Sequence, residues 1–112
     1  MAASAITVQT VDIIGEVITF AAANIDGNYF ANDGLTYLHV KNGGTGPIIV
    51  TINSVKNCSY GFDHDLSIII ANDIEKVIGF FSKKRFNTVD GVVEITYSGI
   101  TAVTVAAVKV TA

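Results

Sequence analysis

Several side chains capable of acid–base or nucleophilic chemistry lie close together in the middle of the sequence. The run GFDHD at residues 61–65 follows Cys58 and Ser59. A histidine beside carboxylates could relay a proton or bind a metal ion, and a neighbouring thiol or hydroxyl could act as a nucleophile. In a strand, however, Asp63 and His64 face opposite sides, and two carboxylates do not complete a coordination shell. We therefore expect a turn whose aspartates cap backbone N–H groups.

The remaining chemical candidates have structural interpretations. His39 lies in an alternating segment, so we expect it at the surface or in a subunit contact. Cys58 is the only cysteine, which excludes an intrachain disulfide and a CxxC pair, and we expect a small buried hydrophobe. There is no GxSxG elbow, and the glycine-rich residues 42–46 lack the ending of a phosphate-binding loop. The sequence therefore predicts a protein that is not an enzyme, with no catalytic residue, cofactor or metal site.

Composition indicates one globular domain with surplus apolar surface. The chain has 112 residues, of which 50% are hydrophobic, and a net charge of -3. A domain of this size hides such a composition with difficulty, so we expect partners to cover part of it. The negative charge argues against a nucleic-acid partner. No apolar run is long enough to span a membrane and no secretory signal is evident, so we expect a soluble, unprocessed protein.

Short apolar segments alternate with turn residues along the chain, a pattern typical of an all-β protein. Asn, Asp and Gly cluster between these segments. The pattern predicts a single-domain antiparallel β-sandwich or jelly roll. The expected strands are Ile6–Thr10, Val17–Ala21, Leu35–Lys41, Ile48–Val55, Leu66–Ala71, Glu75–Phe80, Val92–Tyr97 and Ala102–Val110.

Two of these segments carry more detailed predictions. In Leu35–Lys41 the odd-numbered side chains should face one side and the even-numbered ones the other. The region Val11–Asn24 has a helical alternative, because some of its apolar residues recur three to four positions apart. Its many β-branched residues and Gly15 favour the extended interpretation.

The first fourteen residues, MAASAITVQTVDII, hold small and β-branched residues and one charge. They are expected to form an extended arm, with the β-sandwich domain over residues 15–112. Two interpretations stay open, which are an arm exchanged with a neighbouring sheet edge and an ordinary first strand with a frayed tip.

The basic cluster Lys83-Lys84-Arg85 lies between Phe81 and Phe86. Basic residues among aromatics can bind single-stranded nucleic acid, but three charges on an acidic chain are weak support for it. A solvated loop and a salt-sensitive contact with an acidic protein are the other interpretations. We expect Phe81 and Phe86 to anchor this loop to the core.

Four stretches resemble a known family: NYFANDGLTYLHVKNGG, YGFDHD, IGFF followed by RFN, and GVVEITYSGITAVTVAAVKV. Together they resemble small all-β virion proteins of tailed bacteriophages, in the neighbourhood of head structural genes. The resemblance covers nearly the whole chain after residue 20. It implies a structural component of the particle, most plausibly a head decoration (cement) protein on the outer capsid surface, assembled in the host bacterial cytoplasm.

A cement role implies the major capsid protein and a homotrimer of this chain as partners, with no membrane and no direct nucleic acid. The main alternative is a head-to-tail connector or tail-associated protein. A carbohydrate-binding module is the alternative of another class, with Tyr29, Tyr37 and Tyr60 as stacking platforms. The residues expected to contact the capsid or other subunits are Ile6, Val8, Val11, Ile13, Ile14, Lys83, Lys84 and Arg85.

Overall fold

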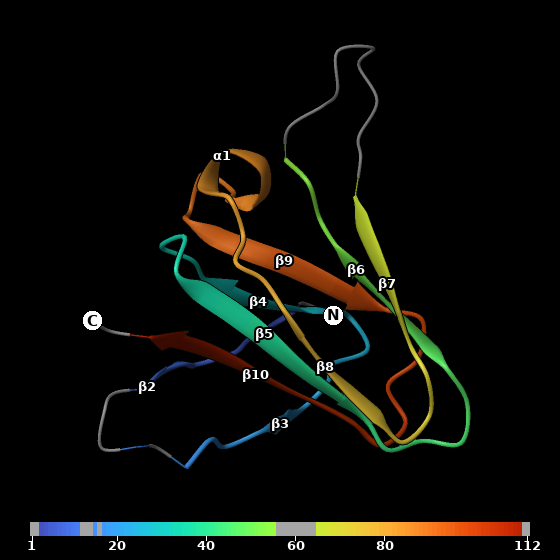
Figure 1. The fold of residues 1–112 in the computed structure, drawn as a ribbon. Coiled ribbons are helices and arrows are strands. Elements are labelled where there is room, and N and C mark those ends of the chain that lie inside the picture. Colours follow the sequence, from blue (N-terminus) through green and yellow to red (C-terminus); the bar gives the residue numbers. More distant parts are fainter. Residues whose placement is uncertain (1–2, 12–14, 16, 56–64, 111–112) are drawn as a thin grey trace.

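The protein is a sandwich of two β-sheets, seen as two layers in Figure 1. The computed structural model describes residues 3–11, 15, 17–55 and 65–110. The strand orders are β1-β4-β9-β6-β7 in one sheet and β2-β10-β5-β8 in the other, with β3 also on β10. The expected all-β sandwich is confirmed. The elements are β1 (Ser4–Ala5), β2 (Val8–Val11), β3 (Ala21–Ala22), β4 (Asn28–Ala31), β5 (Thr36–Asn42), β6 (Ile48–Ile52), β7 (Leu66–Ile70), β8 (Ile74–Ile78), α1 (Lys83–Phe86), β9 (Val92–Tyr97) and β10 (Val103–Val110).

Four antiparallel pairings show how the chain is wound. β3 pairs with β10, β4 with β9, β5 with β8 and β6 with β7. From β3 onward, the first half of the chain thus pairs with the second half in reverse order, like one long hairpin. β10 also pairs with β5, and β6 with β9, which rolls this hairpin into two facing sheets. This winding is that of a jelly roll.

The core lies between the two sheets and follows from strand alternation. Along β5 every second side chain is buried, beginning with Thr36, so the facing predicted for residues 35–41 is confirmed. Burial of each large apolar side chain contributes about 1.5–3 kcal/mol of transfer free energy. Fully buried large side chains include Phe30, Phe81, Leu38, Ile52, Ile70, Ile95, Val40, Val50, Val93, Val103, Val105 and Val108.

Near the N-terminus one predicted strand was wrong and one observed strand was not predicted. Only Ala21 of Val17–Ala21 lies in a strand, and the helical alternative is absent from the described residues of that region. Phe20 instead packs on side chains of β5, with its ring centroid 4.9 Å from that of His39 and 3.9 Å from Lys41 Nζ. β4 was missed because its four residues are too few to show alternation.

The segment between β8 and β9, for which a solvated loop was one interpretation, is a helical turn. Phe86 N donates to Ser82 O at 3.0 Å, and Asn87 N donates to Lys83 O at 3.1 Å. Phe81 and Phe86 are 2% and 5% exposed, so their anchoring role is confirmed. None of the helices in the described part of the chain is both long and apolar enough to cross a membrane.

Residues 3–11, here called the N-terminal strap, cross from one sheet to the other. β1 pairs in parallel with β4, and β2 pairs in parallel with β10. Ile6 lies between the two short strands and is 6% exposed in the core. Within one chain, therefore, most of the predicted arm closes one side of the sandwich. A division of the chain after residue 14 stays a prediction.

Candidate functional site

The side of the sandwich opposite the strap contains an apolar groove. β7 and β8 are the edge strands there, one from each sheet. A hollow of about 450 Å³ lies between them. Its apolar lining comprises Leu66, Ile68, Ile78, Phe81 and Phe86, together with parts of the chain next to them. We call this hollow the β7–β8 groove.

Two cationic side chains border the β7–β8 groove. Lys76 extends across from β8, and its Nζ donates a hydrogen bond of 2.9 Å to the carbonyl oxygen of Ile69 on β7. Arg85 places its guanidinium carbon 4.7 Å from the ring centroid of Phe86. Long cationic side chains cover apolar surface with their stems while the charge stays in water. The groove thus combines an apolar floor with a basic rim.

Exposed apolar side chains are frequent on this side of the sandwich, on the outer faces of both sheets. Of the ten large hydrophobic residues that are exposed in the described part of the chain, five lie on β7, β8, the residue after Gly79 or the strand next to β7. Ile49 and Ile69 are register partners on the outer face of one sheet, whereas Val77, opposite His39, lies on the outer face of the other. The five are Ile49 (42% exposed), Ile69 (62%), Ile74 (47%), Val77 (61%) and Phe80 (56%).

Gly79 explains why one phenylalanine of the pair after β8 points outward. Its φ is +145°, and a Cβ at this position would lie 2.9 Å from Cβ of Tyr37. Only glycine permits so close a pass over β5. The next two side chains then diverge, with Phe81 in the core and Phe80 on the surface, where its ring centroid lies 6.2 Å from that of Tyr37.

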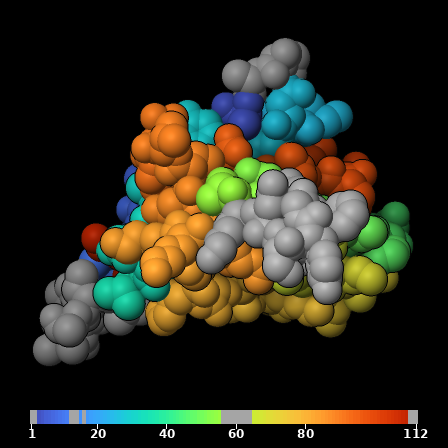
Figure 2. All heavy atoms as spheres, turned by 90° about the horizontal axis from the view of Figure 1, so that it is seen from above, coloured from blue at the N-terminus to red at the C-terminus, as the bar shows by residue number. Residues whose placement is uncertain are grey.

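The three predicted basic residues Lys83, Lys84 and Arg85 form α1, and all three are exposed. Figure 2 shows the orange α1 segment and the gold end of β8 together on one face of the molecule. Arg85 borders the β7–β8 groove itself. The structure therefore brings one residue of the basic cluster, Arg85, to the apolar groove.

Two asparagines fix α1 to the sandwich, and sequence analysis missed both. Asn32 Nδ2 donates to Phe81 O at 3.1 Å and to Asn87 Oδ1 at 2.7 Å. Asn87 Nδ2 donates back to Asn32 O at 2.9 Å. Because buried amides are costly unless they are paired, this reciprocal arrangement holds α1 in one position. Asn32 was visible only as part of a turn signal.

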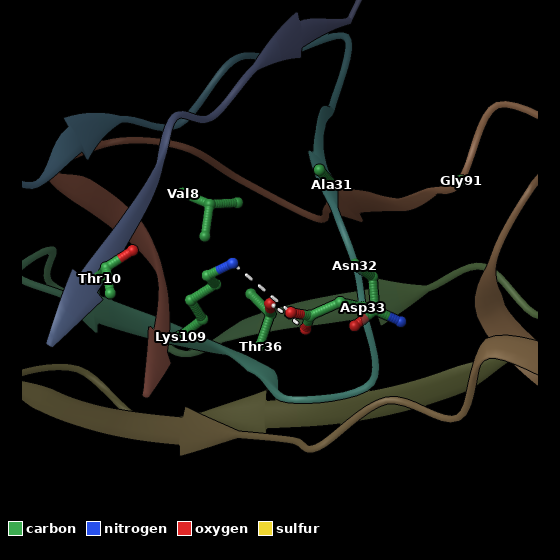
Figure 3. Close-up of a pocket in the computed structure, with 8 residues that line it drawn as sticks. All are labelled: Val8, Thr10, Ala31, Asn32, Asp33, Thr36, Gly91 and Lys109. Carbon is green, nitrogen blue, oxygen red and sulfur yellow. Dashed lines mark hydrogen bonds and ion pairs between the residues drawn. The ribbon is translucent and has the colours of Figure 1, made fainter. Parts of the chain in front are cut away.

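The strap side has a different character. Figure 3 shows a pocket there, with Asp33, Thr36 and Lys109 directed toward one another and the strap residues Val8 and Thr10 beside them. Lys109 Nζ lies 3.6 Å from Asp33 Oδ2, and Thr36 Oγ1 donates to Asp33 Oδ1 at 3.1 Å. The pocket volume is about 280 Å³. This side thus presents a polar pocket with an ion pair.

Electrostatics keep the carboxylate of Asp33 charged. The backbone N–H of Leu35 donates to Asp33 Oδ1 at 2.9 Å. This hydrogen bond is the main cause that lowers the pKa of Asp33 below its ordinary value, and Thr36 and Lys109 act in the same direction. At neutral pH the group therefore stabilises the turn between β4 and β5 as an anion.

The predicted contact residues in the N-terminal segment are only partly placed at the surface. Ile6 is buried, whereas Val8 and Val11 are half-buried in or beside β2. Ile13 and Ile14 lie outside the described residues. Sequence analysis did not single out Ile69, Val77 or Phe80, because a strand pattern does not show which strand will be an open edge.

The other chemical candidates that lie in the described residues form no common site. His39 is held by Glu75, with Nε2 2.9 Å from Oε1, and by the Phe20 ring. Tyr29 and Tyr37 lie on different sheets, each flanked by buried neighbours, so they face outward on opposite sides and form no common platform. The segment 56–64, with Cys58, Ser59, Tyr60, Asp63 and His64, lies outside the described residues, and the enzyme question stays a prediction.

Metal chemistry finds no support within residues 3–11, 15, 17–55 and 65–110. No group of three or more His, Cys, Asp or Glu side chains in these ranges is placed to hold a metal ion. Comparisons with protein-family models, with curated proteins and with solved structures gave no significant match.

Proposed function

We propose that this chain is a decoration (cement) protein that binds the outer surface of a tailed-bacteriophage head and stabilises the assembled shell. The observation that carries the proposal is the open, apolar β7–β8 groove bordered by Lys76 and Arg85, with exposed apolar side chains on the outer faces of the two sheets beside it. A surface of this composition suits a protein partner with apolar and acidic groups. The resemblance in sequence supplies the identity of that partner as the major capsid protein.

The fold is compatible with this role but does not establish it. Jelly rolls occur in viral capsid proteins and also in lectins. Function is therefore argued from the surface and not from the architecture. For the carbohydrate alternative, Tyr29 and Tyr37 lie on opposite outer faces and do not share one platform. Tyr60 lies outside the described residues, so this alternative stays a prediction.

Stabilisation follows from binding that prefers the assembled shell. A ligand that binds only one state stabilises this state by RT ln(1 + [L]/Kd) at each site. Because the sites repeat over a symmetric lattice, a small stabilisation at each site adds up to a large stabilisation of the particle. A homotrimer placed on threefold positions of the lattice would engage three shell sites at once, which strengthens attachment by multivalency.

The test is reconstitution on expanded heads that lack this protein. We expect the native chain to bind throughout the lattice, and Ile69→Asp to lose at least tenfold in affinity, since a charge would replace an exposed apolar side chain on the edge strand β7. The matched control is Ile25→Asp, because Ile25 is 70% exposed in a turn on the strap side. Thermal unfolding confirms that both variants are folded.

Copy number distinguishes the alternatives within the particle. A lattice protein occupies every equivalent position, whereas a connector ring holds about a dozen copies or fewer at one vertex. Binding confined to one vertex would replace the decoration proposal with the connector alternative. If Ile69→Asp and the native protein bind equally well, the β7–β8 surface does not contact the shell.

A further inference from the structure

We propose that the N-terminal strap is exchanged between copies of this chain, so that each strap completes the two sheets of a neighbour. The occupant of the strap position is then the same segment, residues 3–11, of a second copy. The inference concerns self-association and does not rest on the proposed function.

The first argument is that the jelly roll is complete without the strap. All four pairings of the rolled hairpin lie between β3 and β10. The strap adds two parallel pairings, one at an outer edge of each sheet. Parallel pairs are slightly less stable per residue than antiparallel pairs. The strap is therefore an addition to a finished fold, and it can be supplied by another chain.

The second argument is that both flanks of the strap are open to the surface. An open pocket of about 280 Å³ lies next to Val8 and Thr10 on one flank. On the other flank a further open hollow of about 320 Å³ is lined by Ala5, Ile6 and Thr7 from the strap and by Val105 from β10. The strap is therefore an outer segment, without another strand of the described chain beyond it to hold it in place.

The third argument is that the contacts of the strap are specific, so they select the same sequence in a neighbour. Ile6 N donates to Tyr29 O at 2.8 Å, and Asn28 Nδ2 donates to Ser4 O at 3.1 Å. The side-chain amide of Gln9 binds both the N–H and the C=O of Thr19, at 2.8 and 2.7 Å. Every one of these partners is present in each copy, which is why exchange of an identical element is a low-cost route to oligomers.

The length of the connection permits exchange. β2 ends at Val11 and β3 begins at Ala21. Thr19 and Phe20 stay at their contacts with the sheet, and residues 12–18 can span roughly 25 Å when fully extended. That reach is enough to carry the strap to an adjacent copy while β3 stays on its own β10.

Disulfide trapping between two chains tests the exchange. Ala5 is opposite Tyr29 in the strap register, and Tyr29 is opposite Glu94 inside the jelly roll. In a Cys58→Ser background, an Ala5→Cys chain and a ¹⁵N-labelled Tyr29→Cys chain are refolded together and oxidised with glutathione disulfide. Neighbouring strands lie at a spacing that a disulfide can bridge. We expect a labelled–unlabelled disulfide dimer, identified by its mass.

The matched control mixes Tyr29→Cys with Glu94→Cys, whose partner positions both belong to the rolled hairpin. The strap mixture should give several-fold more mixed dimer than this control. Equal yields in the two mixtures would overturn the proposal, as would a double variant, Ala5→Cys with Tyr29→Cys, that closes only an intrachain bond. Binding of Ile69→Asp to heads is measured separately, so the failure of one proposal leaves the other intact.

Discussion

The two open sides of this sandwich are finished in different ways. On the strap side the chain covers its own sheet edges, buries Ile6 and leaves a polar pocket around an ion pair. On the β7–β8 side no further strand of the described chain is added, and large apolar side chains such as Ile69 and Val77 are exposed among polar ones. One side is closed by the strap, in its own copy or by the proposed exchange, whereas the other side is left for a different partner. The contrast separates self-association on the strap side from binding of another protein on the β7–β8 side.

The largest expected effect compares two isoleucines from the two sides. Ile6→Ala should lower the free energy of unfolding by about 2–5 kcal/mol, because it leaves a cavity in the core. Ile69→Ala should cost about 1 kcal/mol or less, since Ile69 is 62% exposed. Urea unfolding of both variants measures the difference. Equal losses would mean that the two sides do not differ in burial as described.

A smaller effect is expected from the lysine that crosses the β7–β8 groove. Lys76→Met removes the hydrogen-bond donor to Ile69 O. It also removes an inward-pointing charge that hinders pairing of the edge strands β7 and β8 with other chains. We expect stability to change by only about 0.5 kcal/mol, while association at raised concentration increases. Sedimentation velocity measures it, with Lys84→Met as a control that makes the same change on exposed α1. If the two variants associate equally, Lys76 does not protect this edge.

The smallest effect concerns the ion pair on the strap side. Because the pKa of Asp33 is lower in the folded chain, its carboxylate contributes stability above the ordinary aspartate pKa. This contribution is lost as the pH falls through the folded-state pKa. Asp33→Asn should therefore melt slightly below the native protein at pH 6 and together with it near pH 2. A constant difference across this range would assign the effect to packing instead of charge.

Much of the fold could be predicted from the sequence because its strands are bounded by strong turn signals. Val92–Tyr97 was predicted with its observed ends, since an alternating run lies between Asp90-Gly91 and Ser98-Gly99. Asn28–Ala31 was missed because so short a strand carries no period. The residues Val17–Phe20 were misassigned because the contact of Phe20 with His39 overrides β propensity.

The interaction surface was less accessible to sequence analysis. Ile68, Ile69 and Ile70 are identical in type, yet Ile69 is 62% exposed and Ile70 is fully buried. The burial of each isoleucine depends on which face of β7 points into the core and on the position of β7 at a sheet edge. Both follow from the strand order of the sheet. The basic cluster was recognised, but its position beside the groove depends on the buried amides of Asn32 and Asn87.

Hydrogen–deuterium exchange of the protein, free and bound to expanded heads, tests the difference between the two sides most directly. On binding, we expect slower exchange of the backbone amides in β7, in β8 and over residues 79–86. The account predicts unchanged protection in the strap, which is already paired with β4 and β10 before binding. Protection confined to the strap side, with β7 and β8 unchanged, would contradict it.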